Sequence, residues 1–269
     1  MPSSTFLSTV SITHISTATA ILTIDDVNFL LDPAFDKSGD FEQEGGFVLT
    51  KTVDPALSLE NLPPIDAVLL SHEDHVDNLD VSGRTLLNGR HVITTMDGAK
   101  NLAPRPGVQG LAPWQSTTIK LNGKEFKITA TPTQHLPGGE CTGFVLESSS
   151  FGVNAADGLS NVVYVSGDTV RIPELSTQLP KKFHTVVAIM NLGKAIAALP
   201  TGPVQITMDG LQAAQLTRDI GAEIMVPLHY ESWQHFTQDE DGVREELEAD
   251  AAVKSKVMWV VPGVVTTVL

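Results

Sequence analysis

The chain has 269 residues, with 32 acidic and 17 basic side chains and a formal net charge of −15. This acidity argues against nucleic acid and anionic membrane surfaces as partners, because both repel negative charge. The one cysteine, Cys141, excludes an intramolecular disulfide and a cysteine-based zinc finger. No stretch reads as a signal peptide or a membrane helix, so we expect a cytoplasmic protein without stable membrane association.

The first part of the chain is expected to form strands that end in polar loops. Residues 10–36 have the alternation of paired strands, with a turn at Asp25 and Asp26. Residues 36–64 are rich in Gly, Asp, Glu and Pro and are expected to form a loop with little regular structure. A short buried strand over 67–70 then leads directly into the polar segment 71–80.

The middle of the chain continues as strands. Asn122 and Gly123 form a strong hairpin signal between two of them. We expect strands over residues 92–95, 116–121, 125–132, 143–147 and 161–166, and a short helix over 97–102.

The last part alternates strands with helices. Strands are expected over 185–190, 223–229 and 257–262. A helix over 207–220 would be capped by Thr207 and ended by Gly221, and a second, charged helix is expected over 243–253. Without repeats or linkers, residues 1–269 are expected to form a single domain, an α/β sandwich in which helices cover sheet faces.

Five side chains that could bind a metal or take part in catalysis follow predicted strands: His72, His75, His135, Asp168 and His229. Imidazole and carboxylate are the usual protein ligands of zinc. A strand that ends in a loop can direct neighbouring side chains to one point, whereas a regular strand directs them to opposite faces. The intervals between these residues are about one or two strand–loop units, which fits ligands gathered at one edge of a sandwich.

The segment 71–80 is the densest part of this set, because it also holds three aspartates. Lone histidines at strand ends are more often structural, and we interpret the remaining four in that way. The three aspartates are Asp74, Asp77 and Asp80, and the four other histidines are His14, His91, His184 and His235.

Six segments resemble motifs of the metallo-β-lactamase-fold hydrolases, in the order of that family. The chain is most similar to the branch that contains the ascorbate-6-phosphate lactonase and the N-acyl-phosphatidylethanolamine phospholipase D. The resemblance covers nearly the whole chain and implies a four-layer αββα sandwich. The segments are Thr13–Thr19, Leu30–Pro33, Ser71–Asp80, Thr131–His135, Ser166–Thr169 and Val226–His229.

The metal loop departs from the family pattern His-x-His-x-Asp-His. A gapless alignment from His72 puts Asp74 and Val76 at the second His and the Asp positions. The register that we favour aligns His75 and Asp77 with the family residues, which leaves Asn78 at the position of the last histidine.

In this register the resemblance implies one metal held by His72, His75 and His135. Asp77 and His229 would hold a second metal, and Asp168 would bridge the two. Amide is a poor zinc ligand, so a single metal or a weakly held second one stays open. Asp74, Asn78 and Asp32 are candidates for substitute ligands or for partners that orient the ligands. Zn²⁺ is expected, and Mn²⁺ or Fe²⁺ are not separated by these ligands.

The expected reaction is hydrolysis by a water molecule that the metal activates, with Asp77 and Asp168 as the catalytic carboxylates. Tyr230, Trp233 and His235 are expected to form a wall facing a small-molecule substrate. The alternative for them is an aromatic cluster packed under the following helix. A small ester or lactone is the favoured substrate. The alternatives are a phosphodiesterase on the same scaffold and a non-catalytic descendant that binds a metal or ligand.

Overall fold

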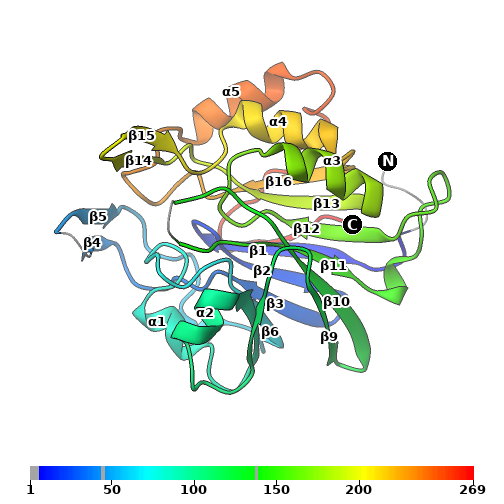
Figure 1. Cartoon of the computed structure of the whole chain (residues 1–269), viewed down its shortest axis with the longest axis horizontal. Coiled ribbons are helices and arrows are strands. Elements are labelled where there is room, and N and C mark those ends of the chain that lie inside the picture. Colours follow the sequence, from blue (N-terminus) through cyan, green and yellow to red (C-terminus); the bar gives the residue numbers. More distant parts are fainter. Residues whose placement is uncertain (1–5, 44–45, 137–138) are drawn as a thin grey trace.

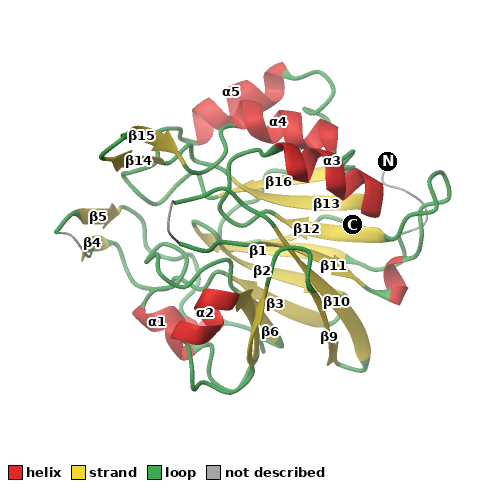
Figure 2. Ribbon diagram, viewed as in Figure 1, coloured by secondary structure: helices red, strands yellow, loops and turns green. Residues whose placement is uncertain are grey.

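Two mixed β-sheets stack face to face, and helices cover the outer face of each (Figures 1 and 2). This arrangement is seen in a computed structural model, in which residues 6–43, 46–136 and 139–269 are described. The first sheet has the order β17 (Val265–Thr267), β1 (Val10–Ser16), β2 (Thr19–Ile24), β3 (Val27–Leu31), β6 (Ala67–Leu69), β7 (His91–Thr95) and β8 (Val108–Leu111). The second has the order β16 (Ile224–Leu228), β13 (His184–Asn191), β12 (Asn161–Val165), β11 (Gly143–Glu147), β10 (Lys124–Thr131) and β9 (Ser116–Leu121).

The remaining elements lie around these sheets. Two small hairpins are formed by β4 (Gly39–Glu42) with β5 (Val48–Lys51) and by β14 (Ile196–Leu199) with β15 (Gly202–Gln205). The α-helices are α1 (Val81–Thr85), α2 (Met96–Asn101), α3 (Pro173–Lys182), α4 (Gly210–Asp219) and α5 (Glu240–Ala249). Single 3₁₀ turns span Leu59–Asn61 and Ser149–Phe151. Among the described residues, no helix combines the length and the apolar character needed to span a lipid bilayer.

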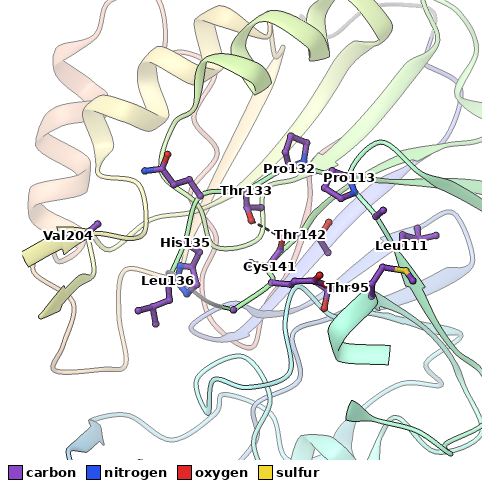
Figure 3. Close-up of a pocket in the computed structure, with 15 residues that line it drawn as sticks. Thr95, Leu111, Pro113, Pro132, Thr133, His135, Leu136, Cys141, Thr142 and Val204 are labelled. Atoms are coloured by element: carbon purple, nitrogen blue, oxygen red, sulfur yellow. Dashed lines mark hydrogen bonds between the residues drawn. The ribbon is translucent and has the colours of Figure 1, made fainter. Parts of the chain in front are cut away.

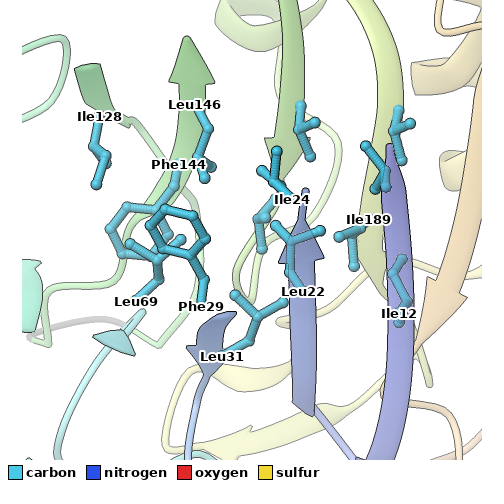
Figure 4. Close-up of a cluster of buried hydrophobic side chains, with 14 of the residues drawn as sticks. Ile12, Leu22, Ile24, Phe29, Leu31, Leu69, Ile128, Phe144, Leu146 and Ile189 are labelled. Carbon is cyan, nitrogen blue, oxygen red and sulfur yellow. The ribbon is translucent and has the colours of Figure 1, made fainter. Parts of the chain in front are cut away.

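Three apolar clusters hold the layers together. The largest lies between the two sheets, where Phe29 and Leu69 of the first sheet face Phe144 and Leu146 of the second (Figure 4). The Phe29 and Phe126 rings of this cluster meet edge to face with centroids 5.1 Å apart. A second cluster joins the second sheet to α3, α4 and α5, and a third packs against the first sheet on the side of α1 and α2 (Figure 2). Because both faces of the central strands are buried, β3, β12, β13 and β16 carry nearly continuous apolar runs, whereas β9 at the edge of the second sheet alternates buried and exposed residues. The predicted four-layer αββα sandwich is confirmed.

Strand direction brings the polar strand ends to one edge. In the second sheet β10, β12, β13 and β16 run in the same direction, as the alternation of antiparallel and parallel pairs requires. In the first sheet β3 and β6 are likewise parallel. Side chains that follow these strands therefore meet at one end of the sandwich, although they come from distant parts of the sequence.

Several predicted boundaries differ from the structure. The segment 36–64 contains the β4–β5 hairpin as well as loop. The predicted strand over 257–262 is wrong, because that segment makes one isolated bridge, between Val257 and Met225, and the last strand is β17. Residues 240–249 form α5, which begins and ends earlier than the predicted helix.

The residue that caps helix α4 differs from the predicted Thr207. Asp209, rather than Thr207, caps this helix by accepting a hydrogen bond from the amide of Gln212 at 2.9 Å. The Thr207 hydroxyl instead accepts the Ala195 amide at 2.8 Å, which ties the start of β14 to the segment before α4. Gly221, with φ of +66°, ends the helix as predicted, since a left-handed conformation favours glycine.

Candidate metal centre

Three histidines converge at the edge of the sandwich where the polar strand ends meet. His72 and His75 follow β6, and His135 follows β10. Nε2 of His72 lies 2.9 Å from Nδ1 of His75, which lies 3.2 Å from Nε2 of His135. All three ligand atoms lie within 4.8 Å of one another, close enough to hold one metal ion.

Hydrogen bonds on the far side of two rings determine which nitrogen carries the proton. Nδ1 of His135 lies 2.8 Å from the carbonyl oxygen of Ile206, so this nitrogen donates. Nδ1 of His72 lies 2.8 Å from Oγ of Ser71, whose own hydrogen is donated to Asp32. Nδ1 of His72 therefore donates to Ser71, and both rings keep a lone pair on Nε2.

These lone pairs make the three histidines a suitable metal site. Burial lowers the pKa of His72 well below its ordinary value and lowers that of His135, so both rings are neutral at pH 7. One proton at most, on Nδ1 of His75, can then lie among the three converging nitrogens. A borderline divalent cation can accept the lone pairs of all three nitrogens, whereas the imidazoles alone cannot all pair with one another.

Asp168 lies against the three histidines at the end of β12. Its Oδ2 is 3.9 Å from Nε2 of His72 and 4.0 Å from Nε2 of His135, and 3.3 Å from Nε2 of His229. Its Oδ1 accepts a hydrogen bond from Nδ2 of Asn191 at 2.7 Å. Burial opposes the charge of Asp168, but the surrounding imidazoles outweigh it and hold the pKa well below its usual range. Asp168 thus presents one ionised oxygen between two groups of ligands.

The second group surrounds Asp77. Its Oδ2 lies 3.6 Å from Nε2 of His229 and 3.5 Å from Nε2 of His235. Burial again opposes ionisation, but the two imidazoles lower the pKa of Asp77 well below its usual value. Nδ1 of His229 lies 3.1 Å from the Leu192 carbonyl oxygen, which directs Nε2 towards the carboxylates. Although burial disfavours a charge on His229, Asp168 and Asp77 raise its pKa well above its ordinary value, so the site favours positive charge.

Asn78 points away from these ligands. Its Nδ2 donates to Oδ2 of Asp32 at 3.2 Å and lies 3.5 Å from Oγ of Ser71. Asp32 also accepts the backbone amide of Ser71 at 2.6 Å, and burial raises its pKa to about 7. Asp32 and Asn78 therefore orient the metal loop through Ser71 and do not face the metal site.

The other predicted site residues lie apart from the three histidines. Asp74 is exposed at the surface of the loop. Tyr230 is buried in the apolar cluster under α3, α4 and α5, with its ring 6.2 Å from that of Trp259, so its predicted place facing the substrate is wrong. The strand ends at Leu228, and the left-handed backbone of His229, with φ of +66°, turns the chain before Tyr230. Trp233 is buried too and donates from Nε1 to Oγ1 of Thr17 at 3.0 Å.

Two polar residues of this centre were absent from the sequence-based set. Asn191 is the last residue of β13, and its position at a strand end beside Asp168 could have indicated it. Cys141 precedes β11, and its Sγ lies 3.6 Å from Nδ1 of His72 and 3.3 Å from the Asp168 carbonyl oxygen. Burial raises the pKa of this thiol well above its ordinary value, so it is protonated at neutral pH.

A pocket of about 570 Å³ opens beside the centre, with His135 and Cys141 in its wall (Figure 3). Its apolar lining comes from segments that are far apart in the sequence, as Leu111, Leu136 and Val204 illustrate. Glu140 is its one carboxylate, and no lysine or arginine among the described residues lines it. The pocket therefore offers a mostly uncharged surface next to a candidate metal ligand.

The family described as "Beta-lactamase superfamily domain" matches residues 27–230, which contain the three histidines, Asp77, Asp168 and His229. The chain belongs to the beta-lactamase superfamily. It is 30% identical over 206 residues to a UPF0173 metal-dependent hydrolase of Methanosarcina mazei, covering 75% of this chain and 80% of the relative. A UPF0173 metal-dependent hydrolase of Methanosphaerula palustris is 28% identical over 194 residues, covering 68% and 76%. Its similarity to these relatives places the chain among the metal-dependent hydrolases of the superfamily.

Solved structures agree in fold. The isothiocyanate hydrolase from Delia radicum gut bacteria has a TM-score of 0.74 at 19% identity, covering 95% of this chain and 98% of the other. A possible metal-dependent hydrolase from Veillonella parvula has a TM-score of 0.72 at 21% identity, covering 98% and 100%. At these identities the similarity establishes the metallo-β-lactamase fold and no substrate.

Proposed function

We propose that this superfamily member hydrolyses a small, uncharged ester or lactone with the help of a bound divalent metal, for which Zn²⁺ is the first choice. The observation that carries the proposal is the position of His135, which belongs to the three converging histidines and also lines the 570 Å³ pocket. A substrate in this pocket would have its reacting group beside the metal ligands.

The chemistry of the pocket favours an uncharged substrate. A second hollow, with His75 in its wall, is also lined by Asp36, Asp40, Glu42, Glu73 and Asp74. Among the described residues that line it, Arg84 is the one arginine or lysine, and its guanidinium is paired with Glu73 at 2.9 Å. Anionic phosphodiesters would meet carboxylates on one side and no cation on the other, which supports an ester or lactone over a phosphodiester.

Each residue of the centre has a distinct part in this proposal. His72, His75 and His135 would hold the metal, and a Zn²⁺ ion with an open position lowers the pKa of a coordinated water to about 7. Oδ2 of Asp168 orients the reacting water, while Asn191 fixes the rotation of this carboxylate through Oδ1. The ionised carboxylate of Asp77 would add negative charge beside the reacting water, while its low pKa makes it a weak proton acceptor.

The test is metal analysis of the purified protein followed by a substrate panel with and without a chelator. The panel contains p-nitrophenyl esters of increasing acyl length, γ- and δ-lactones, bis-p-nitrophenyl phosphate and an aryl isothiocyanate. The isothiocyanate is included because a fold neighbour is named for this activity and because its reacting carbon is uncharged. We expect chelator-sensitive turnover of esters or lactones that His135→Ala abolishes and His91→Ala, which changes an exposed histidine, leaves intact.

Other outcomes would redirect or reject the proposal. Turnover of the phosphodiester alone would favour the phosphodiesterase that the phospholipase resemblance suggests. Stoichiometric metal without turnover of any panel member would favour a non-catalytic metal-binding protein. Full activity in metal-free protein would reject metal-dependent hydrolysis. The cytoplasmic location and the small molecule as sole partner stay predictions.

A further inference from the structure

The donor atoms around Asp77 form a set separate from His72, His75 and His135. Nε2 of His229 lies 3.3 Å from Asp168 and 3.6 Å from Asp77, and Nε2 of His235 lies 3.5 Å from the same oxygen of Asp77. These three contacts link two imidazole nitrogens and two carboxylate oxygens in a chain, in the order His235, Asp77, His229 and Asp168, which is less compact than the group of His72, His75 and His135. No lysine or arginine pairs with Asp77 or Asp168 in the part of the chain that the structure describes.

Nε2 of His229 supports a ligand role for this set. The atom is fully buried and has no hydrogen-bond partner of good geometry among the described residues. Its only close partners are the carboxylates of Asp168 and Asp77, at 3.3 and 3.6 Å, and neither contact has good hydrogen-bond geometry among the described residues. A cation beside Asp77 and Asp168 would satisfy this nitrogen.

The metal loop offers only a weak fourth ligand to such a cation. The last histidine of the family pattern is replaced by Asn78, whose side chain is buried and whose Nδ2 donates to Asp32 at 3.2 Å. Its amide oxygen, which has no hydrogen-bond partner among the described residues, binds zinc less strongly than an imidazole. Another imidazole is required if the second group is to bind metal as strongly as the first.

His235 is positioned to take this place. It lies in the loop after β16, six positions beyond His229 in the sequence, and its ring packs 4.5 Å from that of Phe236 and 5.9 Å from that of Trp233. These contacts hold the ring although its side chain is 26% exposed. The rigid aromatic neighbours explain how a loop residue can present Nε2 to Asp77 in a defined orientation.

We propose that His235 supplies the imidazole that position 78 lacks and completes a second metal site with Asp77, Asp168 and His229. Two ligand atoms bound to one tetrahedral zinc ion are about 3.4 Å apart, given metal–ligand distances of about 2.1 Å. The three successive contacts of 3.5, 3.6 and 3.3 Å from His235 through Asp77 and His229 to Asp168 match this separation, and the bound ion would draw the ends of the chain together. The proposal rests on the metal centre of the proposed function and is independent of its substrate.

Metal stoichiometry tests this assignment without reference to activity. Wild type, His235→Ala and the control His91→Ala are loaded with excess Zn²⁺, dialysed and analysed for metal by mass spectrometry. We expect about two zinc ions per chain in wild type and control and about one in His235→Ala, since the second ion of a two-metal site loses a direct ligand. Matching circular dichroism of the three proteins verifies that the variants fold.

A ligand-replacing variant supplies a spectroscopic readout. With Co²⁺ in place of zinc, His235→Cys is expected to show a thiolate-to-cobalt charge-transfer band that is absent from wild type, which retains Cys141 as the baseline. The proposal is overturned if wild type binds one metal at saturation, or if His235→Ala keeps two. Loss of both metals in His135→Ala with no change in His235→Ala would place all metal at the three histidines and also reject it.

Discussion

Oγ of Ser71 lies 2.8 Å from Nδ1 of His72 and donates a hydrogen bond to Oδ2 of Asp32, also at 2.8 Å. Because Nδ1 of His72 donates to the adjacent Ser71, Nε2 is the nitrogen that His72 presents to the metal site. Partners of this kind fix the tautomer and orientation of ligating histidines and raise their affinity for metal.

Removal of the Ser71 hydroxyl is expected to weaken the first metal. In Ser71→Ala, Nδ1 of His72 loses its acceptor, and affinity for Zn²⁺ is expected to fall about 10- to 100-fold. Competition with a chromophoric chelator measures this change. Ser58→Ala, which removes an exposed hydroxyl, serves as the control. Equal affinities in the two variants would show that the hydrogen bond does not orient the ligand.

Metal binding is expected to stabilise the fold. An ion that binds the native state alone, at a free concentration about 100 times its Kd, adds about 2.7 kcal/mol to the free energy of unfolding. Thermal unfolding with and without Zn²⁺ should therefore show a higher Tm for the loaded protein. The increase should be smaller in His135→Ala, which loses a ligand of the first metal, and should be unchanged in His91→Ala. A Tm that is unaffected by zinc in wild type would contradict the assignment of the three histidines.

His14 is expected to make stability depend on pH. Burial lowers the pKa of His14 to about 4, while its Nε2 lies 3.0 Å from the Thr17 carbonyl oxygen. Between its unfolded pKa of 6.5 and pH 4 the unfolded chain binds a proton that the folded chain does not, so stability falls as pH falls through this window.

Replacing His14 should remove this dependence. From pH 7 to pH 5 wild type is expected to lose about 2 kcal/mol more than His14→Gln in urea unfolding experiments. Exposed His91, changed to Gln, provides the matched control. If wild type and His14→Gln lose the same stability over this interval, the neutral buried state of His14 is wrong.

A cation placed in the pocket should change substrate preference. Met96 lines the pocket and is 51% exposed, so Met96→Lys adds a positive charge without disturbing the core. The KM for an ester with an anionic acyl group is expected to fall several-fold at low salt, with little change for a neutral ester. Leu211→Lys, which changes an exposed side chain of α4, controls for the change in net charge. An identical response of both variants would place the substrate elsewhere.

Much of the fold could be predicted because local patterns carry it. The Asn122–Gly123 turn joins β9 to β10 as predicted, since both residues take the positive φ that a tight hairpin needs. The strand predicted over 257–262 failed because an apolar run shows that a segment is buried and does not show that a neighbouring strand is available to pair with it. The hairpin of β4 and β5 was missed because its residues have little apolar alternation.

The candidate site divides in the same way. Residue types and their positions after strands were enough to predict His72, His75, His135, Asp168 and His229 as one set, because parallel strand ends meet at one sheet edge. Hydrogen bonding and side-chain direction depend on contacts between segments that are distant in the sequence. The tertiary structure alone therefore decided that Asn78 faces Asp32, that Tyr230 is buried under the helices and that His235 approaches Asp77.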